Sequence, residues 1–86
     1  MKLKDGFILR EVAGERVVIP TGDALDLNMM ITLNESGAFL WKQLEQETTE
    51  NGLVTALLAE YDVDEATART CVAAFVAKMK EHDFLA

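Results

Sequence analysis

The side chains that most often carry enzyme chemistry are sparse in this sequence. His82 is the only histidine, and it lies near the expected end of a helix, where a lone imidazole is usually solvated. General acid–base catalysis needs a partner that positions the imidazole and a pocket that surrounds it. Cys71, the only cysteine, falls on the apolar arc of the same expected helix, so the pattern predicts a buried and unreactive thiol.

Acidic residues are plentiful, but their spacing does not predict a metal site. Asp62, Asp64 and Glu65 lie close together, yet they lack the central glycine and the distant glutamate of a calcium-binding loop. Helix capping explains them better, because Asp62 with Glu65 resembles a capping box and Asp64 is a rival cap. One cysteine allows neither an internal disulfide nor a cysteine zinc site, and no phosphate-binding glycine motif occurs. We therefore predict a protein without catalytic residues, metal or cofactor.

Length and charge restrict the possible partners. The chain has 86 residues, 50% of them hydrophobic, which predicts a single domain over residues 1–86. Asp and Glu number 15 against 8 Lys and Arg, for a net charge of −7. Nucleic-acid backbones and anionic membrane surfaces are poor partners for such a chain, because both require clustered cations. No apolar run has the length of a signal peptide or a membrane span, so we expect a cytoplasmic protein.

The stretch LDLNMMITLNESG, residues 25–37, is the centre of the expected fold. Apolar residues occupy every second position from Leu25 to Leu33, which is the period of a half-buried strand. In this register Met30 lies on the outer face. At Asn34, a favoured helix N-cap, the pattern changes to that of a helix. The residues before this junction read as strands and the residues after it as helices.

The remaining elements follow from turn residues and apolar periodicity. Two short β-rich runs around Gly14 and Glu15 predict a hairpin, and Pro20 ends its second strand. A second helix begins after Thr48 or Thr49. The predicted strands are residues 7–13, 16–19 and 25–33, and the first and third helices are residues 35–46 and 65–81. This order predicts an α+β, winged helix-turn-helix-like fold, with a three-stranded antiparallel sheet followed by three helices and the last strand at an edge.

The third expected helix carries two neighbouring stripes. Its core arc recurs at helical spacing and consists of Ala68, Cys71, Val72, Phe75 and Met79. Beside it lies a second stripe made of Arg69, Ala73, Val76 and Lys80. Small residues on the second stripe would leave room for another chain, and its terminal cations would suit an acidic peptide. Alternatively, the alanines are ordinary helix formers and the cations are solvated.

Three segments together resemble the PqqD-like family, which includes the pyrroloquinoline quinone synthesis chaperone and related peptide-recognition domains. They are FILREVAGERVVIP, ITLNESGAFLWKQL and LLAEYDVDEATARTCVAAFVAKMKEHDFL. The most specific part is LNESGAFLW, which is similar to the family's Leu-Asn-Glu string entering the first helix. The YDVD step before the third helix is the second match. The resemblance covers residues 7–85.

The resemblance implies a peptide-binding adaptor. Such domains bind the leader segment of a ribosomally made precursor peptide and present it to a modifying enzyme, often a radical S-adenosylmethionine enzyme. The leader adds as an antiparallel strand to the third strand, in the groove between that strand and the third helix. The implied peptide-binding residues are Leu25, Asp26, Leu27, Asn28, Met29, Met30, Ile31, Thr32, Arg69, Ala73, Val76 and Lys80.

Two other functions remain compatible with the sequence. A winged-helix fold often binds DNA through its last helix, although the cations of this helix are few and diluted by acids. The free edge of the last strand could instead form a homodimer, for example by swapping through the loop of residues 21–24. Neither alternative requires a cofactor.

Overall fold

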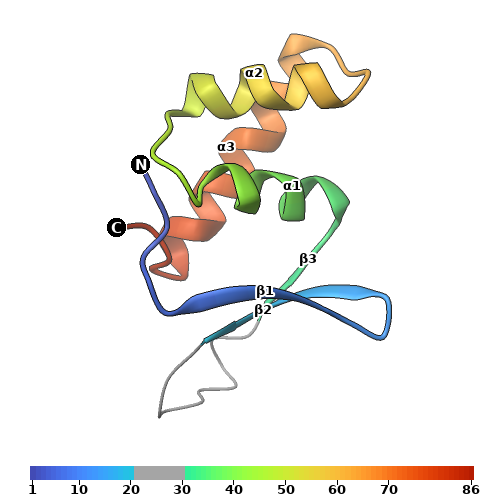
Figure 1. Ribbon diagram of the computed structural model, residues 1–86. Helices are drawn as coiled ribbons and strands as arrows, with labels where there is room; N and C mark the ends of the chain where they lie inside the picture. Colours follow the sequence, from blue (N-terminus) through green and yellow to red (C-terminus); the bar gives the residue numbers. More distant parts are fainter. Residues whose placement is uncertain (21–30) are drawn as a thin grey trace.

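Three strands and then three helices follow one another along the chain in the computed structural model (Figure 1). The structure describes residues 1–20 and 31–86. The strands are β1 (Phe7–Val12), β2 (Glu15–Pro20) and β3 (Ile31–Leu33). The helices are α1 (Glu35–Gln43), α2 (Glu50–Glu60) and α3 (Glu65–Glu81). The predicted α+β class and element order are confirmed.

The described strands form an antiparallel sheet in the order β1-β2-β3, so β3 lies at an edge as predicted. Ala13 and Gly14 connect β1 to β2, and their φ angles of 51° and 83° are those of a two-residue hairpin turn of type I′. The turn therefore begins one residue before the predicted Gly14-Glu15 pair. Gly14 adopts this left-handed conformation without the steric conflict that a Cβ atom would introduce.

The expected alternation of faces holds along β3. Ile31 and Leu33 are buried while Thr32 is exposed, as the period of two requires. Val18 on β2 pairs with Ile31, and both side chains belong to the core. The predicted strand began at Leu25, and its residues 25–30 lie outside the described part of the chain.

Each helix begins at a capping side chain. Asn34 accepts a hydrogen bond from the N–H of Gly37 at 2.7 Å, which confirms the predicted junction. Thr49, one of two predicted candidates, accepts from Gly52 at 3.0 Å. Asp64, the rival of the Asp62 capping box, accepts from Thr67 at 2.8 Å and starts α3. These caps satisfy backbone donors that have no partner within the helix.

The first helix is shorter than predicted, since it ends at Gln43 and not at residue 46. After Leu44 the chain makes tight turns in which Glu45 and Gln46 bond to carbonyls three residues back. The N–H of Thr48 then donates to the carbonyl of Met1, which draws the chain away from the helix axis.

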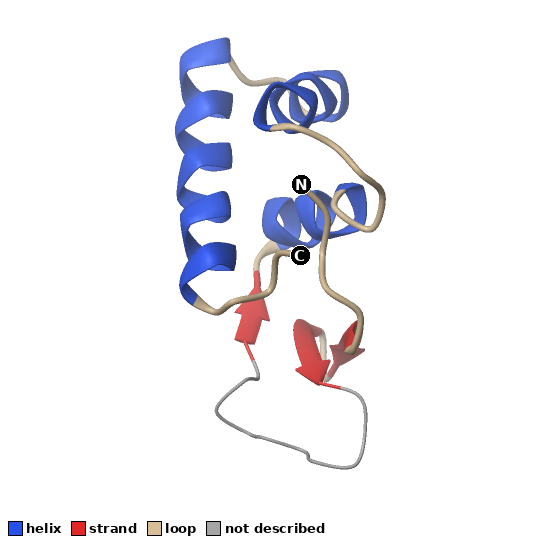
Figure 2. Cartoon of the chain, turned by 90° about the vertical axis from the view of Figure 1, so that its left-hand side faces the viewer, coloured by secondary structure: helices blue, strands red, loops and turns tan. Residues whose placement is uncertain are grey.

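All three helices lie on one side of the sheet (Figure 1), and α3 is the long helix that stands at one side in Figure 2. The core between these layers is wholly apolar, and the described buried residues include no polar or charged side chain. Trp41 and Phe84 are both buried and meet edge to face, with ring centroids 5.6 Å apart. The burial of Phe84 shows that the segment after α3 folds back onto the domain.

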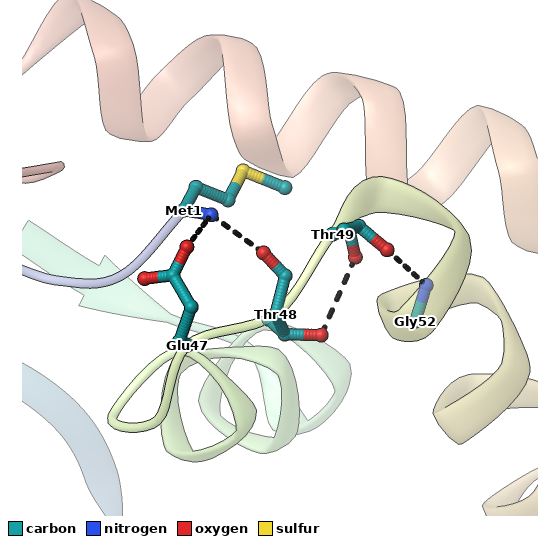
Figure 3. Close-up of polar contacts among 5 residues, drawn as sticks. All are labelled: Met1, Glu47, Thr48, Thr49 and Gly52. Atoms are coloured by element: carbon teal, nitrogen blue, oxygen red, sulfur yellow. Dashed lines mark hydrogen bonds and ion pairs between the residues drawn. The ribbon is translucent and has the colours of Figure 1, made fainter.

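The segment before β1 also belongs to the packed structure, which the sequence did not predict. Leu3 is buried and forms a β-bridge with Leu85. The amino group of Met1 donates to Glu47 at 2.8 Å and to the carbonyl of Thr48 at 2.6 Å (Figure 3). These bonds connect the first residues to the linker between α1 and α2.

Within residues 1–20 and 31–86, the helices are too short or too polar to cross a lipid bilayer.

Candidate functional site

An open groove of about 430 Å³ lies between the edge strand β3 and helix α3. Thr32 and Leu33 of β3 form one wall, and the first turns of α1 close one end. The described residues that line it are Thr32, Leu33, Asn34, Ser36, Gly37, Leu40, Cys71, Ala74, Phe75 and Lys78. The family resemblance implies a peptide-binding groove between the same two elements.

The end of the groove at α1 is shaped by a close backbone approach. Gly37 lies under the capping side chain, and a Cβ atom there would sit 3.0 Å from the Asn34 Oδ1 atom and 3.5 Å from the Leu33 Cβ atom. A larger residue at position 37 would therefore push against the cap. The hydroxyl of Ser36 also donates to Asn34 Oδ1, at 3.2 Å. The junction that ends β3 thus fixes one end of the groove.

The wall on α3 is one stripe of the helix, which we call the groove stripe: Cys71, Ala74, Phe75 and Lys78. These residues are three or four positions apart, so they share one face of the helix. Phe75 is buried at 7% exposure and supplies the apolar floor, while Cys71 and Ala74 are exposed and small. Because Cys71 and Ala74 are small, the stripe leaves space above Phe75.

The second stripe, which the sequence predicted as the helical wall, does not line this groove. Val76 is 2% exposed and belongs to the core, so its side chain is unavailable at the surface. The guanidinium of Arg69 donates to Glu65 and to Asn51 on α2, each at 3.1 Å. Ala73 and Lys80 are exposed but are not among the lining residues. The structure therefore separates these four residues from the groove.

Cys71 corrects a second prediction. The apolar arc assigned its thiol to the core, but the side chain is exposed and lines the groove. Val76 takes the core position instead, because α3 packs mainly against α2 and also against α1. The core arc is thus rotated toward Val76, and the other members of the predicted arc remain buried.

The predicted residues of the strand are only partly placed. Ile31 is buried with its side chain in the core, and Thr32 is exposed and lines the groove. Leu25, Asp26, Leu27, Asn28, Met29 and Met30 lie outside the described residues. Ala74 and Lys78 were missed by the sequence reasoning. Their i, i+4 spacing was visible in the sequence, but it does not say which face of α3 adjoins β3.

The described lining of the groove carries a single charge, which is the cation Lys78. Its side chain is half-buried, and the ion pairs of the described residues involve other cations, namely the Met1 amine, Lys4 and Arg69. The positive end of the α1 dipole opens onto the same groove and adds partial charge of the same sign. No group of three or more metal-binding side chains occurs among residues 1–20 and 31–86.

Two solved structures share this architecture. One is TbiB1 in complex with the TbiA(beta) leader peptide, with 25% identity and a TM-score of 0.76, over 99% of this chain and 94% of that chain. The other is lasso peptide synthetase B1 complexed with the leader peptide, with 20% identity and a TM-score of 0.72, over 96% and 93% of the two chains. Because the identity to the second structure is only 20%, that similarity shows a shared fold alone.

The search of curated proteins gave no match. The family described as coenzyme PQQ synthesis protein D (PqqD), however, matches residues 8–85. This match confirms the resemblance seen in the LNESGAFLW junction and the YDVD step. Because it spans nearly all of the sequence, the chain belongs to the PqqD family.

Proposed function

We propose that this chain is a non-catalytic adaptor that binds the leader segment of a ribosomally made precursor peptide. The leader adds to the sheet as an antiparallel strand beside β3 and is then presented to a modifying enzyme. One observation carries the proposal: an exposed edge strand faces a helix across an open groove of about 430 Å³. An extended peptide needs this combination of unpaired backbone groups and side-chain space.

The backbone of β3 supplies the pairing. Strand β3 pairs with β2 along one side, where Thr32 lies opposite Val17. No described strand pairs with its other side. Outward-facing N–H and C=O groups gain partners when another strand is added. The similar solved structure of TbiB1, which is in complex with the TbiA(beta) leader peptide, supports this choice of ligand.

Side chains of the groove stripe would select among peptides. On the helix side we place the contacts at Cys71, Ala74, Phe75 and Lys78, because these residues line the groove. On the strand side, we place the peptide contacts at Thr32 and at the preceding residues of the predicted strand, which begins at Leu25. Backbone pairing would supply much of the affinity, and the pockets would supply selectivity.

The enzyme partner belongs to the same proposal. We infer a cytoplasmic peptide-modifying enzyme, of the radical S-adenosylmethionine class or another, because the family resemblance implies such a partner. The described residues of this chain carry no candidate metal cluster of their own. Omitting the adaptor from a reconstituted reaction should slow modification of the full precursor but not of a precursor without its leader.

An N-methyl scan of the leader tests strand addition directly. Candidate leaders come from precursor peptides encoded near the gene, and each is made with one backbone amide methylated at a time. Methylation removes a donor without changing a side chain. Since alternate amides of a strand face the same neighbour, affinity should fall at every second position, by about fivefold or more. Fluorescence anisotropy of labelled peptides gives the affinities.

The pattern of the scan distinguishes strand addition from other binding modes. A helical ligand would lose affinity along a continuous run of positions, because its amides bond within the peptide. A scan without any period of two would contradict strand addition even if the leader binds. Failure of every neighbouring leader to bind would contradict the adaptor function itself.

The homodimer and the DNA-binding regulator remain alternatives from the sequence. A homodimer would use the same edge of β3 and would compete with the leader, so sedimentation with and without peptide separates the two. DNA binding predicts an affinity that falls steeply with salt, which a mobility shift at low salt would detect.

A further inference from the structure

We propose that Lys78 selects an acidic residue in the leader, and that this residue follows an apolar one by two positions. The recognised sequence is thus apolar-X-Asp or apolar-X-Glu, read from the N-terminus. This inference rests on the proposed function and deepens it, because it states which peptides the groove takes.

The charge distribution supports an acidic ligand. The chain as a whole has 15 acidic against 8 basic residues, yet none of the described lining residues is acidic and one of them is a lysine. No described carboxylate pairs with Lys78, whereas Arg69 on the same helix is bound to Glu65. A carboxylate from the ligand would complete a charge-assisted hydrogen bond in a partly desolvated groove.

The floor of the groove supports an apolar neighbour. Leu33, Leu40 and Phe75 line it from three different elements, and all three side chains are buried. Ala74 is exposed and small, so it leaves the surface above them open. A large apolar side chain placed there would remove further apolar surface from water, which favours binding.

The spacing follows from helix and strand geometry. Ala74 and Lys78 are four residues apart, so their Cα atoms are separated by about 6 Å along the axis of α3. Two side chains on one face of an extended peptide, at positions i and i+2, are separated by about 6.6 Å. A ligand strand can therefore place one side chain beside Ala74 and the next one of the same face beside Lys78.

The direction follows from the arrangement of the two walls. In both views β3 rises toward α1 while α3 descends past it (Figures 1 and 2). A peptide antiparallel to β3 consequently runs in the direction of α3. It meets Ala74 first and Lys78 second, so the apolar residue precedes the acidic one.

Selection from a phage-displayed library of random 12-residue peptides tests the motif without knowing the precursor. Peptides selected on the unmodified protein should be enriched in an apolar residue followed two positions later by Asp or Glu. Selection on Lys78→Glu should replace that acid with Lys or Arg. In anisotropy measurements, a selected acidic peptide should bind Lys78→Glu about tenfold more weakly, and changing its acid to Lys should restore binding.

Lys80→Glu is the matched control, because Lys80 is exposed on α3 two residues away and does not line the groove. It changes the net charge equally and should select the same acidic peptides as the unmodified protein. The inference is overturned if selected peptides show no acidic preference, if Lys78→Glu retains the acidic motif, or if both lysine variants behave alike. Binding peptides with another motif would leave the adaptor function intact, whereas no enriched peptide at all would contradict both proposals.

Discussion

The residues of two stripes alternate along the sequence of α3, but the two stripes have opposite environments in the structure. The groove stripe faces β3 across open space and includes the exposed residues Cys71 and Ala74. The second stripe includes Val76, which is buried, and Arg69, which is bonded to α2. A shift of a few positions along one helix thus separates a candidate binding surface from the interior. Periodicity describes the stripes, but the neighbouring elements decide which of them is free.

The largest expected effect separates the two stripes by stability. Val76→Asp would bury an unpaired carboxylate in an apolar core, and we expect a loss of about 4 kcal/mol in the free energy of unfolding. Ala74→Asp places the same group on an exposed position, so its loss should stay below about 1 kcal/mol. Urea denaturation followed by circular dichroism measures both. Equal losses would mean that the two positions do not differ in burial.

The next effect separates the stripes by binding. Ala74→Trp fills the groove, and we expect leader affinity to fall about thirtyfold, or about 2 kcal/mol. Ala73→Trp adds the same ring to the adjacent exposed residue, which does not line the groove, and should change affinity less than about twofold. Isothermal titration with the leader compares them. A larger loss at Ala73 would return the binding surface to the second stripe.

A smaller effect concerns the thiol that the sequence assigned to the core. Because Cys71 is exposed, a thiol reagent should label the folded protein within about tenfold of its rate on the unfolded chain. A buried thiol would be protected about a thousandfold or more, since it would react only after opening. Saturating leader peptide should slow the labelling, and Cys71→Ser shows the background. Strong protection without peptide would contradict the exposed position.

The smallest effect concerns Asp64, the N-cap residue of the helix that carries both stripes. Hydrogen bonds from Thr67, first from its side chain and then from its backbone N–H, lower the pKa of Asp64 below its ordinary value of 3.8. The folded state thus favours the carboxylate, so this stabilisation is present above pH 3.8 and is lost as the pH falls through the lowered pKa.

Asp64→Asn keeps a capping oxygen but cannot titrate in this range. Urea midpoints of the two proteins are measured between about pH 2.5 and 6. The difference between the two midpoints should change as the pH falls, because only the unmodified protein loses the contribution of the Asp64 charge. A difference that stays constant across that range would show that the Asp64 charge has no influence on folding.

Local signals were sufficient for much of the fold. Asn34 ends an alternating strand and begins a helical pattern, and the structure places the cap there. Asp64, one of the two caps that the sequence left open, precedes α3, whose predicted start at Glu65 is confirmed. Both depend on side chains that bond to backbone only three residues away, so they can be inferred from a short window of sequence.

Contacts between distant segments were not predictable in the same way. Helix α1 ends at Gln43, and the turns after it lead to the hydrogen bond between Thr48 and Met1, which are 47 residues apart in the chain. The choice between Cys71 and Val76 for the core depends on where α2 packs against α3. Both flank the same apolar arc, and helical periodicity treats them alike.

Amide NMR of the labelled protein, titrated with leader peptides from the gene neighbourhood, shows directly which stripe of α3 the leader contacts. We expect shifts to concentrate at Ile31–Leu33 and at the groove stripe, while Arg69, Ala73 and Lys80 change little. Slow-exchange or saturable shifts of this kind would place the leader between β3 and α3. Shifts concentrated on the second stripe, or spectra unchanged by every leader, would contradict leader binding between β3 and α3.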